Sequence, residues 1–213
     1  MRKFIMFTFS IVISAVLSAC SMFGNSGVDI APYSVLEKDG AIEIRRYDTI
    51  VLATADMPGG MDKGDNQAFQ KLFDYISGAN VTADKIAMTA PVFMQEKQEG
   101  QKIEMTAPVF MSENENRETM SFVLPSSFNF ETAPKPTDPA VRLEKIENFT
   151  VAAITFSGFL SASNIQNHKN TLEEWIKASN YTQTAPYQVA GYNPPWTIPF
   201  LRRNEVLIPV EKK

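Results

Sequence analysis

The order of strand-like and helix-like segments is the feature that most constrains how this chain folds. Short, partly alternating apolar segments predict strands, and two longer segments with helical spacing predict helices. Strands precede and follow each predicted helix, so the chain divides into two halves of similar order. This indicates a duplicated β-α-β-β unit and favours an α+β fold over a parallel α/β sheet. The predicted strands are Tyr33–Lys38, Ala41–Tyr47, Thr49–Asp56, Thr119–Leu124, Val141–Glu147, Phe149–Phe156 and Arg203–Val210.

The first helix is predicted from about Asp65 to Ser77, and Gly78 stands where a helix stop is expected. Its apolar residues recur at i, i+3, i+4 and i+7 and so form one stripe. They are Phe69, Leu72, Phe73 and Ile76. The second helix is predicted from about Ser163 to Ala178, with Ile165, Leu172 and Ile176 on one face.

A local repeat lies between the two halves. Lys85–Glu96 recurs as Lys102–Glu113, and both copies contain the run Met-Thr-Ala-Pro-Val-Phe-Met. The short polar link between them, which contains Gly100, predicts that the copies pair as a hairpin. The proline in each copy removes a ladder donor, so each copy is expected at a bulge or an edge.

The first residues have the layout of a bacterial export signal. Two basic residues precede the apolar run Phe4–Leu17, which is shorter than the roughly 20 residues that span a bilayer. Leu17-Ser18-Ala19-Cys20 resembles a lipobox, with Cys20 as the lipidated first residue of the mature chain. The alternative is an ordinary signal peptide in which Cys20 is incidental. The predicted division is a lipoprotein signal peptide at 1–19, a lipidated tether at 20–31 and one domain at 32–213.

Charge and cysteine content narrow the partners. Without residues 1–19 the net charge changes from −4 to −6, and no basic stripe is visible, which argues against nucleic acid as a partner. Cys20 is the single cysteine, so no intramolecular disulfide forms. Ser21 follows it, and the absence of Asp there favours an outer-membrane lipoprotein facing the periplasm. We expect a monomer.

Several segments, in order from about Tyr33 to Val210, resemble the SOUL haem-binding family. They are Glu43–Tyr47, Tyr75–Asn80, the two Met-Thr-Ala-Pro-Val copies, Phe156–Gly158, Gly191–Pro195 and Arg202–Val206. The resemblance implies a distorted antiparallel β-barrel of two pseudo-repeated β-α-β-β halves flanked by two helices. It also implies similarity to gyrase-inhibitor-like effector-binding domains, which capture small molecules in a groove. The ligand it implies is haem or another porphyrin, not covalently attached.

Candidate contacts for such a ligand follow from its wide apolar face and its two carboxylates. The apolar candidates are Phe69, Leu72, Phe73, Ile76, Met88 and Met105. The helix stripe among them is also how most helices dock onto a core, so both interpretations stay open. Arg46 and Lys85 are candidate cations for the carboxylates, as are Arg45, Lys71, Arg202 and Arg203. For Arg203, next to Glu205, an ion pair that fixes the barrel is favoured.

An iron ligand is harder to assign. His168 is the single histidine and borders the apolar face of the second helix, where a half-exposed structural histidine is the favoured interpretation. Other residue types that ligate iron are available in Met57, Met61, Met88, Met105 and Tyr47.

Two further functions stay open. A hydrolase on the same scaffold would use groove carboxylates, for which Glu43, Glu104 and Glu205 are candidates. The sequence offers no Ser-His-Asp set, no Cys/His metal cluster and no glycine-rich phosphate loop to support an enzyme. A structural envelope lipoprotein with a closed groove is the other alternative.

The lipobox generates the first testable prediction. Cys20→Ser removes the acylated side chain, and each buried methylene of a lipid contributes about 0.8 kcal/mol to membrane binding. We therefore expect the variant to leave the membrane fraction when cells are lysed and fractionated. Ser21→Ala, which keeps Cys20, is the matched control and is expected to stay with the membrane. Unchanged fractionation of Cys20→Ser would contradict the lipoprotein assignment.

Overall fold

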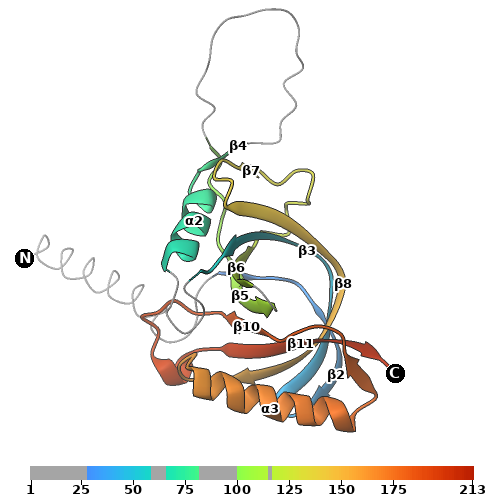
Figure 1. Ribbon diagram of the computed structural model, residues 1–213. Helices are drawn as coiled ribbons and strands as arrows, with labels where there is room; N and C mark the ends of the chain where they lie inside the picture. The colour runs from blue at the N-terminus through green and yellow to red at the C-terminus, as the bar shows by residue number, and fades with distance from the viewer. Residues whose placement is uncertain (1–27, 59–65, 82–99, 115–116) are drawn as a thin grey trace, which may run out of the picture.

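The computed structural model describes residues 28–58, 66–81, 100–114 and 117–213, which build an antiparallel barrel with two helices on its outside (Figure 1). The helices are α2 (Asn66–Ile76) and α3 (Ala162–Ala178), with a 3-10 turn η2 (Pro199–Leu201). The strands are β1 (Asp29–Ile30), β2 (Ser34–Asp39), β3 (Ile42–Asp56), β4 (Asn80–Val81), β5 (Thr106–Asn114), β6 (Arg117–Val123), β7 (Lys135–Pro136), β8 (Val141–Phe156), β9 (Tyr181–Gln183), β10 (Gln188–Gly191) and β11 (Asn204–Lys212).

Six strands close the barrel. They are hydrogen-bonded in the order β3-β6-β5-β10-β11-β8 and back to β3, and every pair is antiparallel. Exchanging β3, β5 and β6 with β8, β10 and β11 maps this ring onto itself, as a duplicated unit requires. The predicted α+β barrel of two β-α-β-β halves is therefore confirmed, with β3-α2-β5-β6 and β8-α3-β10-β11 as the two halves.

β3 and β8 are longer than predicted. The sequence predicts a break at Asp48 and another at Asn148, but each strand runs on for 15 and 16 residues. Tyr47 pairs with Phe149 and Thr49 with Glu147, so Asp48 and Asn148 lie opposite each other between two regular pairs. Asn148 has a positive φ of 50°, a conformation that Asn tolerates well. The polar residues thus mark an irregularity inside a continuous ladder, not an end.

The two copies of the repeat do not pair along the strand that the structure describes. The first copy lies outside the described residues, and the second contributes β5. From Val109 to Ser112 one edge of β5 bonds to β6 and the other to β10. Because both edges are occupied, the predicted hairpin between the copies is wrong along this strand, and β5 pairs with the strand that follows it.

α3 covers one side of the barrel as predicted. Ser161 caps it by accepting a hydrogen bond from the backbone N–H of Asn164. Leu172 and Ile176 are buried against the outward residues of β8 and β11, and Ile165 packs at the edge of the same cluster. The predicted stripe of the second helix is confirmed.

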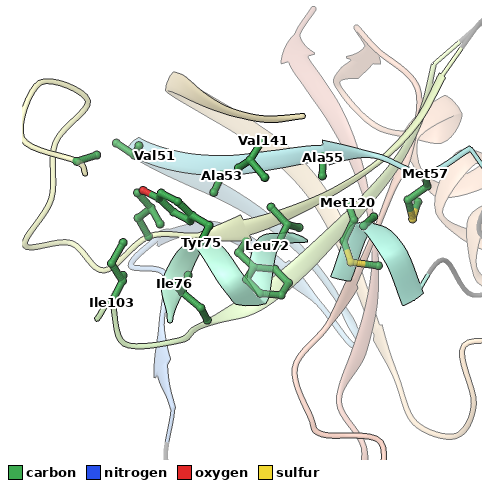
Figure 2. Packing of buried hydrophobic residues seen from close by; sticks show 14 residues of the cluster. Val51, Ala53, Ala55, Met57, Leu72, Tyr75, Ile76, Ile103, Met120 and Val141 are labelled. Carbon is green, nitrogen blue, oxygen red and sulfur yellow. The ribbon is translucent and has the colours of Figure 1, made fainter. Parts of the chain in front are cut away.

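α2 covers the other side but with a different face from the predicted one. Its buried residues are Ala68, Leu72, Tyr75 and Ile76. Figure 2 shows Leu72, Tyr75 and Ile76 beside Val51, Ala53 and Ala55 of β3. Small residues on both elements let the helix approach the sheet closely. The docking face therefore shares Leu72 and Ile76 with the predicted stripe but is rotated toward Ala68 and Tyr75, by less than the roughly 100° between successive residues of a helix. The two phenylalanines of the predicted stripe lie outside it.

Side chains fill the inside of the barrel. Twelve buried residues make up this inner cluster: Ala31, Tyr47, Ile50, Leu52, Ala107, Phe110, Val123, Val151, Ala153, Ala190, Tyr192 and Leu207. Next to them lies an ion pair between Arg45 of β3 and Glu205 of β11, with 2.7 Å between Nη1 and Oε2. Both side chains are at most 2% exposed.

Glu205 is bound from several directions. Arg203 donates to Oε1 at 2.7 Å, Thr155 donates to Oε1 at 3.1 Å, and the Tyr192 hydroxyl donates to Oε2 at 2.7 Å. Burial would raise the pKa of the Glu205 carboxyl, but the hydrogen bond and charge of Arg45, the charge of Arg203 and the hydrogen bond from Tyr192 hold this pKa below its ordinary value. The favoured ion pair between Arg203 and Glu205 is confirmed.

This cluster generates a stability prediction. Glu205→Gln removes the buried carboxylate that Arg45 and Arg203 share and leaves Arg45 with Glu43 as its ion-pair partner. Breaking a buried pair typically costs about 3–5 kcal/mol of unfolding free energy. Glu144→Gln is the control, because Glu144 pairs with Arg142 on the surface at 41% exposure each and should cost less than about 1 kcal/mol. Urea unfolding at neutral pH measures both values.

The same variant has a pH signature. The Glu205 pKa is lower in the folded than in the unfolded state, so its contribution is present above the ordinary carboxyl pKa and is lost as pH falls through the folded value. The wild type should therefore lose more stability than Glu205→Gln when pH falls below about 4.3, the ordinary glutamate pKa. Parallel pH profiles of the two proteins would contradict the assigned role.

Candidate ligand-binding groove beside helix α2

A groove of about 710 Å³ lies beside the C-terminal half of α2. We call it the α2 groove. One wall is the helix, the other is the segment that leads into β5, and the N-terminal part of the described chain completes it. Its lining residues are Val28, Asp29, Phe73, Ile76, Ser77, Lys102, Ile103, Glu104 and Met105.

The helix wall carries exposed aromatic rings. Phe69 and Phe73 are one helical turn apart, and their rings stack with centroids 6.2 Å apart and planes 13° apart. Each residue is 42% exposed, and Phe69 also meets the edge of Phe122 at 5.5 Å. Because α2 docks through Leu72 and Ile76, the two phenylalanines project from the flank of the helix. Apart from the contact between Phe69 and the core residue Phe122, they present an apolar surface to the solvent.

The opposite wall is fixed to the end of α2 by Asn80. This buried side chain donates to the carbonyls of Tyr75 and Gln101, each at 2.7 Å, and accepts from the Gln101 N–H at 2.9 Å. The Ile103 N–H donates to the carbonyl of Ile76 at 2.7 Å, which continues the attachment. The wall is therefore held by the last turn of the helix and by one amide side chain.

A close backbone approach supports this attachment. A Cβ at Gly100 would collide with the carbonyl oxygen of Gly78, so glycine is required there. Gly78 itself has a φ of 122°, a conformation that favours glycine. The two glycines let the start of the wall cross the helix end within backbone contact distance.

The charges of the groove are mixed and lie at its surface. Lys102, Asp29 and Glu104 are exposed, while Ile103 is buried and Met105 is 37% exposed. An ammonium group beside an aromatic and thioether surface suits a flat apolar molecule that carries a carboxylate. The described residues contain no group of three or more His, Cys, Asp or Glu side chains that could hold a metal ion.

Nearly all of the barrel and its two helices matches one protein family. The profile described as SOUL heme-binding protein matches residues 28–100 and 93–209. The chain belongs to the SOUL heme-binding protein family. The residues matched include both helices, five of the six barrel strands in full, β11 up to residue 209, and both walls of the α2 groove.

Curated relatives of this SOUL protein match over most of their length. Heme-binding protein 1 of Mus musculus is 28% identical over 194 residues, covering 87% of this chain and 94% of the relative. Heme-binding protein 2 of Homo sapiens is 29% identical over 185 residues, covering 85% and 83%.

Solved structures show the same fold at low sequence identity. The C-terminal domain of EcmrR aligns with a TM-score of 0.52 at 12% identity, covering 85% of this chain and 99% of that domain. A hydrolase from Listeria innocua aligns with a TM-score of 0.50 at 11% identity, covering 83% and 94%. These likenesses concern the fold alone.

The structure brings part of the predicted site of this SOUL protein together. Phe73, Ile76 and Met105 line the α2 groove, and Phe69 stacks on Phe73 beside it. Leu72 is fully buried and packs in the core under the helix. The residues of the helix stripe therefore divide between the core, which contains Leu72 and Ile76, and the surface beside the groove, where Phe69 and Phe73 lie.

Other candidates lie elsewhere or outside the described residues. Met88 and Lys85 fall outside them. Arg46 is exposed on β3, 3.6 Å from the Asp48 carboxylate, and does not line the groove. His168 lies on α3, where its ring stacks on Phe156 at 4.1 Å and its Nδ1 is 2.8 Å from the Asn164 carbonyl oxygen. No residue of α3 lines the groove.

Of the carboxylates considered for a hydrolase, Glu43 and Glu205 share the Arg45 guanidinium, and Glu104 lies apart from them in the groove. Glu205 is bound inside the barrel, and Glu43 accepts hydrogen bonds from Lys38 and Arg45 at 2.8 Å. The Glu43 pKa is lowered, chiefly by the hydrogen bond from Lys38. Glu104 alone of the three lines the groove.

Sequence reasoning missed the cation of the groove and the residue that fixes its wall. Lys102 belongs to the second copy of the repeat, whose alternation predicts a strand, but residues 101–105 precede β5 and have no regular structure. The sequence identifies Asn80 only as part of a family motif. Its role in fixing the wall could not be predicted, because its partner Gln101 is 21 residues away in the chain.

Proposed function

We propose that this chain binds haem or another flat tetrapyrrole in the α2 groove and acts as a carrier, buffer or scavenger held at the bacterial cell envelope. The observation that carries the proposal is the stacked, half-exposed Phe69–Phe73 pair beside a groove of about 710 Å³. Ligand pockets of drug-sized molecules span about 300–1,000 Å³. The family and the names of its curated relatives support this choice of ligand.

The residues present fit the ligand class through packing, and one cation, Lys102, lies among them beside the carboxylates of Asp29 and Glu104. Phe73, Ile76 and Met105 offer an apolar surface for one face of the ring, and the Lys102 ammonium is available to a peripheral carboxylate. Bound haem would supply iron chemistry. Among the lining residues the Met105 thioether is the side chain of a type that ligates haem iron. We therefore infer that apolar packing provides most of the affinity.

Attachment to the envelope is proposed from the sequence. The lipobox-like run ending at Cys20 precedes the described domain by a short segment, so an acylated Cys20 would hold the groove close to a membrane. Within the described ranges, no helix is long and apolar enough to cross a bilayer.

Phe73→Ala tests the proposed site. Burying a phenylalanine side chain is worth about 1.5–3 kcal/mol, so its loss should raise the Kd for haem at least about tenfold. Phe130→Ala is the matched control, because Phe130 has the same 42% exposure and does not line the groove. Titration of the protein followed by the Soret band measures both. Equal affinities of the two variants, or no saturable binding by the wild type, would overturn the proposal.

His168→Ala gives an independent prediction. The His168 ring stacks on Phe156 of β8, and its Nδ1 contacts the Asn164 carbonyl oxygen. His168 and Asn164 both lie on α3, which does not line the groove. We expect its removal to change the haem Kd by less than about threefold, which is under 0.7 kcal/mol. If the variant lost nearly all haem binding, or lost a six-coordinate haem spectrum that the wild type showed, His168 would be identified as an iron ligand and the site would lie at α3.

A further inference from the structure

We propose that the loops at the β8–α3 and β10–β11 connections form a contact surface for an anionic lipid bilayer. Phe159 of the first loop and Trp196 and Phe200 of the second are 61%, 65% and 70% exposed. These are the three highest values among the exposed large hydrophobic residues of the described ranges. We call the three residues the aromatic loop cluster. It is separate from the α2 groove, whose lining contains none of them.

Hydrogen bonds hold the two loops together. The Gly158 N–H donates to the carbonyl of Pro199 at 2.8 Å, and the Asn204 side chain donates to the carbonyl of Gly158 at 3.0 Å. The chain between β10 and β11 projects from the barrel at the end away from the C-terminus (Figure 1). The exposed rings are therefore presented by a bonded pair of loops at one end of the molecule.

Arg202 connects the rings to a positive charge. Its Nε donates to the Thr197 carbonyl at 2.8 Å, its Nη2 donates to the Pro195 carbonyl at 2.6 Å, and its guanidinium lies 5.1 Å from the centre of the Phe159 ring. The guanidinium thus bridges both loops. Three prolines, Pro194, Pro195 and Pro199, restrict the backbone of the second loop further.

The charge of the cluster contrasts with that of the whole chain. Residues 157–161 and 192–203 contain no acidic residue and carry Arg202 and Arg203, whereas the full chain has a net charge of −4. Arg203 pairs with Glu205, and Arg202 is the cation that lies over a ring of the cluster, that of Phe159. An acid-free aromatic surface with a guanidinium complements an anionic headgroup layer, where Trp and basic side chains are favoured.

Size favours a lipid surface over a protein partner. With a full side-chain surface of roughly 150–250 Å² each, the three rings expose about 400 Å² together. A stable protein interface buries about 800 Å² on each partner. Insertion of a few rings between headgroups needs no such minimum, because each ring transfers its own surface from water.

Vesicle binding tests the proposal. All three buried clusters of the described chain are built from residue 31 onward, so a chain that begins at Ser21 keeps every contact they contain and lacks the apolar leader. We expect it to co-sediment with vesicles of phosphatidylcholine and phosphatidylglycerol. In a Trp175→Phe background Trp196 is the remaining tryptophan, and its emission should shift to shorter wavelength on binding.

Two double variants make the test specific. Trp196→Ser with Phe200→Ser should lower the partition coefficient at least about tenfold, which is 1.4 kcal/mol. Val35→Ser with Leu36→Ser is the control, because these β2 residues are 48% and 49% exposed outside the cluster, and it should change the coefficient less than about twofold. Circular dichroism confirms that both variants are folded.

Three outcomes would overturn the proposal. They are no vesicle binding by the wild type, equal loss in the two double variants, or a concentration-dependent dimer that the Trp196/Phe200 variant abolishes in the absence of vesicle binding. The last would assign the surface to a second copy of the chain. Haem titration of the loop variant separates this proposal from the groove, because its haem Kd should stay at the wild-type value.

Discussion

Inside the barrel, one carboxylate is bound by two guanidinium groups and a phenol, and the arrangement of the strands depends on it. Glu205 lies on β11, Arg45 on β3, and Thr155 on the β8 strand between them. Tyr192, which directly follows β10, donates to Glu205. Arg203 donates to the hydroxyl of Tyr33, near the start of the domain, at 3.1 Å. Any shift of these strands would leave a charge buried without its partner, which is far more costly than the loss of an ordinary contact. The charge cluster and the apolar side chains around it occupy the inside of the barrel, so the candidate ligand site lies on the outer flank.

The duplicated halves place a helix on each flank, but the two helices are used differently. α3 buries Leu172 and Ile176 and packs Ile165 beside them, so its predicted apolar stripe is its docking face. α2 docks through Ala68, Leu72, Tyr75 and Ile76, and Tyr75 satisfies its hydroxyl on the Pro134 carbonyl at 2.8 Å. Ala68 and Tyr75, whose hydroxyl is hydrogen-bonded, thus lie at the interface where the sequence predicts Phe69 and Phe73. Because the two phenylalanines stay exposed, α2 forms the wall of a groove, whereas the corresponding helix α3 only packs against the barrel.

The sequence predicts the elements well because each depends on local periodicity, and it predicts the site poorly because the site depends on rotation and long-range contact. The predicted stripe of α2 contains two of the four residues that dock, Leu72 and Ile76, but the helix buries Tyr75 and not Phe73, and Tyr75 packs in one cluster with Ala53 and Ala55 of β3. Asp48 and Asn148 read as strand ends because polar residues often end strands. They prove to be an irregularity, because each lies opposite the other in a ladder whose pairing no local pattern encodes. Lys102 lies in the groove because Asn80 binds the residue before it, Gln101, which is 21 residues further along the chain.

The first residues of β5 relate the α2 groove to the aromatic loop cluster. Thr106 and Ala107 pair with Asp29 and Ile30 of β1, and Val109, two residues further along β5, pairs with Gly191, the last residue of β10. Val28 and Asp29 line the groove, and the loop bearing Trp196 starts directly after Gly191. A bilayer that received the loop rings would therefore lie at the end of the barrel where the N-terminal segment also joins the sheet. If Cys20 is acylated as proposed, its acyl group and the rings would hold the same end, because the seven residues between Cys20 and Val28 let these two residues lie at most about 29 Å apart. Flat apolar ligands accumulate in membranes, so this orientation would place the groove wall next to the phase from which such a ligand is taken.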